Sequence, residues 1–279
     1  MVTWIFFGRV LPERFPLSVS LPTATVKQPE LGIVYDSHVG IAEGQLVAEV
    51  TVTEGDVDIQ TLRNLTERDI RLMTDMTGYQ NGMAHDIEII SAFCRETAER
   101  CVFGVTVPIL SERREGKFQT LIDGPLWLAY ASDTGARLAL SDFREAIKRA
   151  ADTGFFCYRA VESMMQGLRP PNASDSAAWA HFRATLHVDR SALDYIKGHA
   201  DAARHGRPGG VTDAERAKVF QLADEIIRRY LEYLVRDNRR LSEAEFPILR
   251  SAANEGSAKL PETEDSADPS TDSHDTLTK

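Results

Sequence analysis

Apolar residues in the first 140 positions of the chain cluster or alternate over short runs, which is the pattern of β-strands. The runs are rich in β-branched and aromatic residues, and proline and glycine separate them. Six to eight strands are expected, at residues 4–10, 15–21, 31–39, 46–52, 87–94, 101–109, 118–122 and 126–130. One helix interrupts them: after Asp56 or Asp58 as its cap, apolar residues from Ile59 to Met76 recur near a period of 3.6. Residues 1–140 are therefore predicted to form an α+β domain, mainly β with one helix, for sensing or interaction.

The hydrophobic period changes at Ser141, where helical patterns replace strand patterns. A long helix is predicted from Ser141 to Leu168, with Ser141 and Asp142 as its cap and two prolines shortly after its end. Later helices are expected to begin at Asp175, Asp189 and Thr212, and a short final one to span 243–252. Thr212 and Glu215 fit a capping box, in which two side chains satisfy two backbone N–H groups. Residues 141–250 are thus predicted to form a four- or five-helix bundle.

The last segment, residues 251–279, is rich in serine, threonine, proline and acidic residues and has almost no large apolar ones. Such a segment cannot bury enough apolar surface to offset the entropy lost on ordering. It is predicted to be a disordered acidic tail. A solvating role is the simple interpretation, and a regulatory or partner-binding role is the alternative.

The net charge of −10 is spread unevenly over these three regions. The first holds 12 basic and 19 acidic side chains, the second 18 and 16, and the third 2 and 7. Nucleic-acid binding needs clustered positive charge. Bulk charge therefore argues against DNA as a partner, and any contact with RNA is expected on the helical part, through a local patch.

Other features narrow the class of protein. No apolar run approaches the roughly 18 residues of a membrane span, and the apolar start lacks the basic residues that open a signal peptide. The chain has three cysteines and no Cys-x-x-Cys pair, which argues against a disulfide framework or a zinc site. We therefore expect a cytoplasmic protein with no membrane partner and no cofactor.

Four histidines lie close together in the helical part, at positions 181, 187, 199 and 205. A metal site would need two of them on one helix face. The spacing of six within each pair turns the side chain by about 240° on a helix, so neither pair shares a face. No metal site is predicted.

The residues Arg204, His205 and Gly206 are predicted to form the last turn of a helix and its stop. Basic side chains at this end complement the helix macrodipole, and glycine adopts the left-handed conformation that ends many helices. Helix termination alone accounts for this pattern. The functional alternative is that Arg204 and His205 contact RNA or a nucleotide, or act in catalysis.

The helix order over residues 141–236, the phrase Ala200-Asp201-Ala202-Ala203-Arg204-His205-Gly206 and the Thr212 cap that follows resemble HEPN domains. These are helical bundles, many of which cut or bind RNA. In that family an arginine and a histidine four to six positions apart, from two protomers, share metal-independent cleavage. Here the arginine for His205 would fall at 199–201 and the histidine for Arg204 at 209–211, and neither is present. The β-rich domain resembles, less strongly, those that precede HEPN modules in some phage-defence proteins.

The resemblance implies a homodimer formed through the bundle. It makes Arg204 and His205 the candidate catalytic residues, and Lys197, His199 and Arg207 the candidate RNA-binding residues. Three functions stay open. The first is an RNA- or partner-binding protein with little or no catalysis, in phage defence or a stress response. The second is an active metal-independent endoribonuclease that uses Arg204 and His205, and the third is a scaffold that dimerises.

Overall fold

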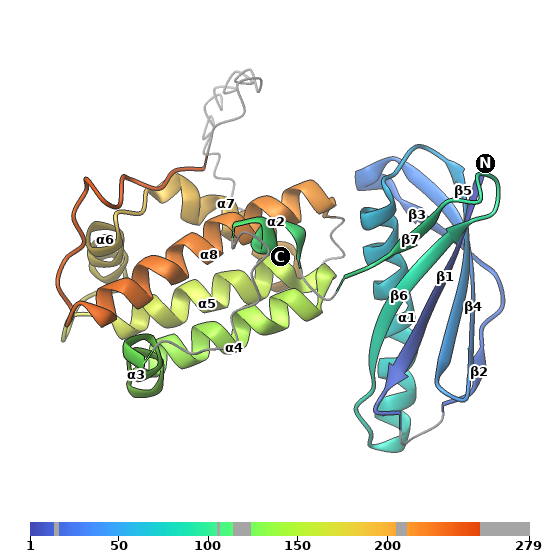
Figure 1. Cartoon of the computed structure of the whole chain (residues 1–279), viewed down its shortest axis with the longest axis horizontal. Coiled ribbons are helices and arrows are strands. Elements are labelled where there is room, and N and C mark those ends of the chain that lie inside the picture. The colour runs from blue at the N-terminus through green and yellow to red at the C-terminus, as the bar shows by residue number, and fades with distance from the viewer. Residues whose placement is uncertain (14–16, 105–106, 114–123, 205–210, 252–279) are drawn as a thin grey trace, which may run out of the picture.

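A computed structural model describes residues 1–13, 17–104, 107–113, 124–204 and 211–251 of the chain. It has two parts, a β-sheet with one helix and a group of helices (Figure 1). The predicted fold class, a mainly β domain followed by a helical one, is confirmed. The predicted acidic tail lies almost wholly outside the described residues.

The first part is an antiparallel sheet in the order β2-β4-β5-β1-β6-β7, with β3 also paired to β4. Its strands are β1 (Val2–Leu11), β2 (Val19–Ser20), β3 (Ala24–Gln28), β4 (Ile33–Ala42), β5 (Gln45–Glu54), β6 (Asp86–Cys94) and β7 (Arg100–Val102). On the central strand β1, the fully buried Phe6 pairs with Ala48 on one side and Ala92 on the other. Two small neighbours leave room for the large ring, so this position anchors the core of the sheet.

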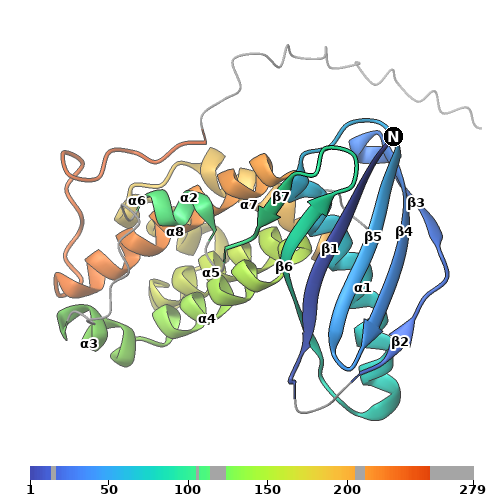
Figure 2. The same ribbon diagram turned by 45° about the vertical axis from the view of Figure 1, so that its right-hand side comes forward.

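Helix α1 (Ile59–Asn81) covers one face of the sheet and lies between the sheet and the other helices (Figures 1 and 2). Its buried residues Leu62, Leu65, Ile70 and Met73 follow the helical period and join the sheet's hydrophobic core. Asp58 caps its first turn by accepting from the backbone N–H of Thr61 at 2.8 Å. Of the two caps that the sequence allowed, Asp58 is the one used.

The second part contains the helices α2 (Pro108–Arg113), α3 (Gly124–Ser132), α4 (Thr134–Lys148), α5 (Thr153–Gly167), α6 (Asp175–Leu186), α7 (Arg190–Arg204) and α8 (Asp213–Val235). A one-turn 3₁₀ segment, η2 (Ala150–Asp152), separates α4 from α5. Helix α5 packs against α4, α7 and α8, and these four form the bundle (Figures 1 and 2). No helix in the described ranges is both long and apolar enough to cross a membrane.

Several predicted elements of this part are wrong. The strand expected at 126–130 is helix α3, because its apolar residues form a continuous run without strict alternation, which periodicity cannot assign. The strand expected at 101–109 ends at Val102, and α2 begins within it. The helices thus begin ahead of residue 141. The strand expected at 118–122 lies outside the described residues.

The long helix expected from Ser141 to Leu168 is two helices. Helix α4 begins earlier, where Asp133 accepts from the backbone N–H of Ala136 at 2.6 Å, so Asp142 lies inside a helix and does not cap one. Arg149 has an extended backbone conformation, which ends α4 and separates it from α5. The final helix expected at 243–252 is wrong over the described residues, which end at 251: residues 243–245 form a turn, Phe246 a bend, and Leu249 bridges to Val188.

The capping box of α8 is confirmed. Thr212 Oγ1 accepts from the backbone N–H of Glu215 at 3.2 Å, and Glu215 Oε2 accepts from that of Thr212 at 2.9 Å. This reciprocal pair fixes where the helix begins.

Helices α5 and α7 meet at Gly154, where an added Cβ would overlap the backbone carbonyl of His199. We predict that Gly154→Ala lowers the free energy of unfolding by about 1–3 kcal/mol, the usual cost of overpacking a core. Gly198→Ala is the matched control, because nothing lies within 4 Å of its added Cβ. It should be neutral or should stabilise α7 by up to about 1 kcal/mol, since alanine is the better helix former. Urea denaturation of both variants measures the difference, and an equal response would contradict this packing.

Candidate functional site

The predicted site residues are only partly covered by the structure. Helix α7 ends at Arg204, while His205 and Arg207 lie outside the described residues. Lys197 is exposed on α7 and lines a shallow surface hollow beside Trp179. His199 is half-buried, and its ring lies 4.8 Å from that of Tyr195. Among the described residues, Lys197 lines that hollow and His199 does not.

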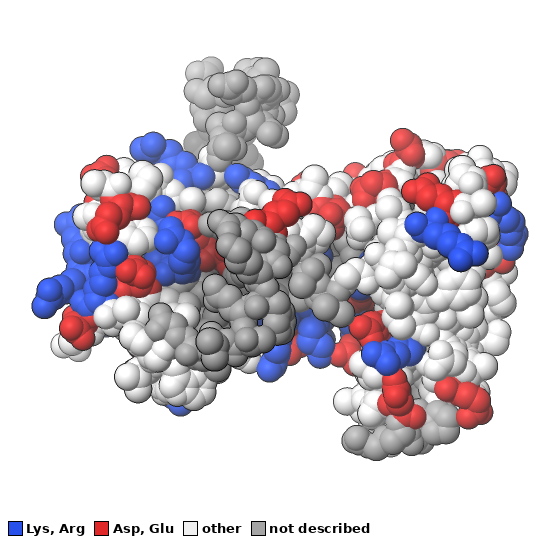
Figure 3. Space-filling view, in the orientation of Figure 1, with Lys and Arg blue, Asp and Glu red and all other residues white. Residues whose placement is uncertain are grey.

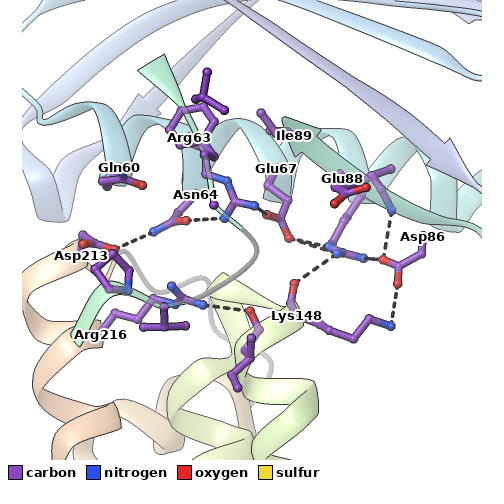
Figure 4. A pocket seen from close by; sticks show the side chains of 18 of the residues that line it. Gln60, Arg63, Asn64, Glu67, Asp86, Glu88, Ile89, Lys148, Asp213 and Arg216 are labelled. Atoms are coloured by element: carbon purple, nitrogen blue, oxygen red, sulfur yellow. Dashed lines mark hydrogen bonds and ion pairs between the residues drawn. The ribbon is translucent and has the colours of Figure 1, made fainter. Parts of the chain in front are cut away.

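A larger cavity lies between the two parts of the molecule (Figure 4). We call it the interdomain cleft, and its volume is about 580 Å³. This is within the range of small-molecule sites. Its charged and amide-bearing lining residues are Arg9, Gln60, Arg63, Asn64, Glu67, Arg71, Asp86, Glu88, Lys148, Asp213 and Arg216. Its apolar lining includes Ile89, Val102, Phe103, Val107, Pro108 and Ile147.

A buried carboxylate organises the α1 side of the interdomain cleft. Glu67 is 2% exposed and binds Arg63, one turn before it, at 2.9 Å and Arg71, one turn after it, at 3.0 Å. A buried carboxylate is stable only when paired and hydrogen-bonded. Glu67 thereby holds two guanidinium groups along the face of α1 that turns away from the sheet.

A second carboxylate joins the two parts of the molecule. Asp86 on β6 binds Arg71 at 2.7 Å and Lys148, at the end of α4, also at 2.7 Å. Burial by itself would raise the pKa of Asp86, but hydrogen bonds from Lys148 and Arg71 outweigh it and hold the pKa below its usual range. Arg71 also donates to the backbone carbonyl of Lys148 at 3.3 Å.

The start of α8 docks on the start of α1. The backbone N–H of Asp213 donates to Thr61 Oγ1 at 3.0 Å, and Asn64 Nδ2 lies 3.5 Å from Asp213 Oδ1. Asp213 is the first residue after the Thr212 cap, so the contact fixes the very beginning of the helix. The helix that follows the predicted Arg204–His205 turn is therefore held by the sheet domain.

Arg216, one turn further along α8, is 7% exposed. Its guanidinium donates to Thr153 Oγ1 at 2.9 Å and to the carbonyl of Ile147 at 3.1 Å, and lies over the ring of Phe220. Burial lowers the pKa of Arg216, and the nearby charge of Arg63 lowers it further. Arg216 thus stabilises the backbone between α4 and α5. All acceptors of its guanidinium hydrogen bonds are neutral oxygen atoms.

The ionisable groups of the interdomain cleft are guanidinium groups, carboxylates and one ammonium group. The described residues that line it include no histidine, cysteine or serine. Across the part of the chain that the structure describes, no group of three His, Cys, Asp or Glu side chains is placed to hold a metal. What the cleft offers is several guanidinium groups beside an apolar wall.

Sequence reasoning did not identify this cleft. Arg63, Glu67 and Arg71 recur every four residues, which reads as an exposed face of charges unless a second domain covers it. Arg216 carried a better signal, because it lies on the same helical stripe as the apolar residues Val219 and Phe220. A charge on an apolar stripe is unusual and marks a buried polar site.

Comparison with known protein families adds one finding. Residues 4–103 match the N-terminal domain of DUF8168, a domain of unknown function, and residues 127–235 match its C-terminal domain. Both parts of the chain therefore match one family, DUF8168. The interdomain cleft takes lining residues from both DUF8168 domains. No curated protein and no solved structure matches the chain.

We predict that Glu67→Gln destabilises this DUF8168 protein by roughly 3 kcal/mol, because breaking a buried ion pair leaves charge uncompensated. Glu88→Gln is the control: its partner Arg9 is exposed, and loss of such a pair costs about 1 kcal/mol or less. Thermal and urea unfolding at neutral pH measure both. Equal stability of the two variants would show that Glu67 does not organise the interdomain cleft.

Proposed function

We propose that the protein binds RNA through the turn between α7 and α8, in the manner of non-catalytic or weakly catalytic HEPN domains. The observation that carries the proposal is the docking of the start of α8 on α1, through Thr61 and Asp213. It links the sheet domain directly to the helix that follows the turn. A sensing domain that acts on an RNA-binding turn needs such a link.

The order of helices supports the proposal. Helices α4, α5, α7 and α8 pack together as a bundle, as the resemblance to HEPN domains implies. Residues 205–210, where the sequence predicts a turn, lie outside the described residues; the described chain ends α7 at Arg204 and resumes just before the capping box of α8. The sequence places Arg204 at the end of α7 and His205 and Arg207 in the segment that follows, which makes three basic side chains in four positions.

Charge on the surface also supports a helical RNA-binding part. In the view of Figure 3, Lys and Arg side chains are most numerous on the helical region, interspersed with acidic ones, chiefly at the end that lies away from the sheet domain. Phosphate contacts need such local positive charge. The acidic sheet domain is then the part that restrains or reports binding, and the bundle also carries the homodimer that the resemblance implies.

The test is a titration of fluorescently labelled single-stranded RNA with the full-length protein, followed by anisotropy. Arg204→Ala combined with Arg207→Ala should weaken binding at least tenfold and reduce its salt dependence, because each lost phosphate contact lowers the number of released counterions. Arg190→Ala, at the exposed start of the same helix, is the matched control and should bind like the wild type.

Two outcomes would contradict RNA binding by this turn: no binding at tens of micromolar protein, or equal binding by the double variant. Gel analysis of the RNA after incubation with a chelator separates binding from cleavage. Intact RNA supports a binding protein. Cleavage that His205→Ala abolishes would instead support the metal-independent endoribonuclease.

A further inference from the structure

The buried guanidinium of Arg216 forms no direct ion pair with a carboxylate of a described residue. Its hydrogen bonds go to Thr153 Oγ1 and to the carbonyls of Ala146 and Ile147. No carboxylate oxygen of a described residue lies within 4.0 Å of it. Its Nη1 donates to no described atom, and Arg216 lines the interdomain cleft. A buried arginine is costly unless it is paired, so an uncompensated one facing a cavity indicates a missing anion.

A second guanidinium approaches from the opposite domain. Arg63 on α1 lines the same cleft, as Figure 4 shows. It uses Nη2 for Glu67 and Nη1 for the side-chain oxygen of Asn64, at 3.1 Å, while its buried Nε has no acceptor. Two like charges are thus held across one cavity, and an anion between them would relieve their repulsion.

The carboxylates that line the cleft do not supply that anion. Glu67 is shared by two arginines, Asp86 by Arg71 and Lys148, and Glu88 is paired with Arg9. Asp213 accepts from Asn64 and forms no ion pair of 4.0 Å or less with a described cation. Asp213 and, more weakly, Glu67 raise the pKa of Arg216, but each does so less than burial and the charge of Arg63 lower it.

Geometry favours a phosphate over a carboxylate as the missing group. The two guanidinium groups come from different sides, and a tetrahedral phosphate presents oxygens in several directions whereas a carboxylate presents two in one plane. Beyond the arginines the cleft is lined by Ile89, Val107 and Phe103, over whose ring the Arg63 guanidinium lies, and this apolar wall can cover an uncharged body beside that guanidinium. The volume of about 580 Å³ has room for a molecule larger than inorganic phosphate.

We propose that the interdomain cleft binds a small phosphate ester, with its phosphate group between Arg63 and Arg216 and its body against the apolar wall around Phe103. The site goes beyond the proposed RNA binding and does not depend on it. Because one arginine belongs to each domain, the ligand bridges the sheet domain and the start of α8. Binding therefore stabilises the docked arrangement of the two domains.

The experiment is isothermal titration calorimetry on the full-length protein at constant ionic strength, with inorganic phosphate, AMP and succinate as probes. AMP should bind more tightly than phosphate, and succinate should be the weakest. Arg63→Gln should weaken AMP binding at least tenfold, the effect of about 1.4 kcal/mol. Arg216→Lys keeps the charge but removes the planar fork and should also weaken it.

Arg9→Gln is the matched control, because the Arg9 guanidinium is already occupied by Glu13 and Glu88 at the rim of the cleft. It should bind AMP like the wild type. The Arg204→Ala and Arg207→Ala double variant should too, which separates this site from the RNA-binding turn. If Arg216→Lys does not fold, Arg63→Gln decides alone, because Arg63 is partly exposed and Glu67 keeps Arg71 as a partner.

Three results would overturn the proposal. The first is no heat of binding with AMP or phosphate at millimolar concentration. The second is AMP affinity in Arg63→Gln equal to that of the wild type. The third is tighter binding of succinate than of AMP, which would reassign the site to a carboxylate.

Discussion

Helix α1 packs against two different neighbours, and the division of its residues between them determines how the domains meet. Leu62, Leu65 and Ile70 belong to the sheet's hydrophobic core. On the side turned to the other helices, Glu67 holds Arg63 and Arg71 in place. The apolar side of α1 stabilises the sheet domain. The charged side can be buried against the helices only where they supply hydrogen-bonding or oppositely charged groups.

Arg216, on the helical side of the cleft, lies opposite the charged residues of α1. By donating to Thr153 and to the carbonyls at the end of α4, it takes over backbone groups that the break between α4 and α5 leaves without helical partners. The same side chain lines the interdomain cleft. One buried residue therefore both secures the backbone between α4 and α5 and lines the cavity, and this combination distinguishes the cleft from an ordinary domain boundary.

Local signals predicted the local features. The Thr212 capping box and the Asp58 cap were readable because both depend on residues three positions apart. The secondary structure of α3 could not be predicted, because a continuous apolar run fits a strand or a helix. The interruption after Lys148 could not be predicted either, because the carbonyls there are hydrogen-bonded by Arg216, which is far away in the chain. The cleft was missed for the same reason: Arg63 and Arg216 are 153 positions apart in the printed sequence.

The close approach at Gly154 has a consequence for the segment after α7. The backbone of His199 rests on the first turn of α5, so the end of α7 is held against the bundle. Val211 and Thr212, on the far side of the segment, lead into a helix start that the capping box and Thr61 fix. A chain segment whose two ends are clamped has fewer conformations to lose when a ligand orders it. RNA binding between α7 and α8, as proposed above, would therefore cost less conformational entropy than binding by a segment with free ends.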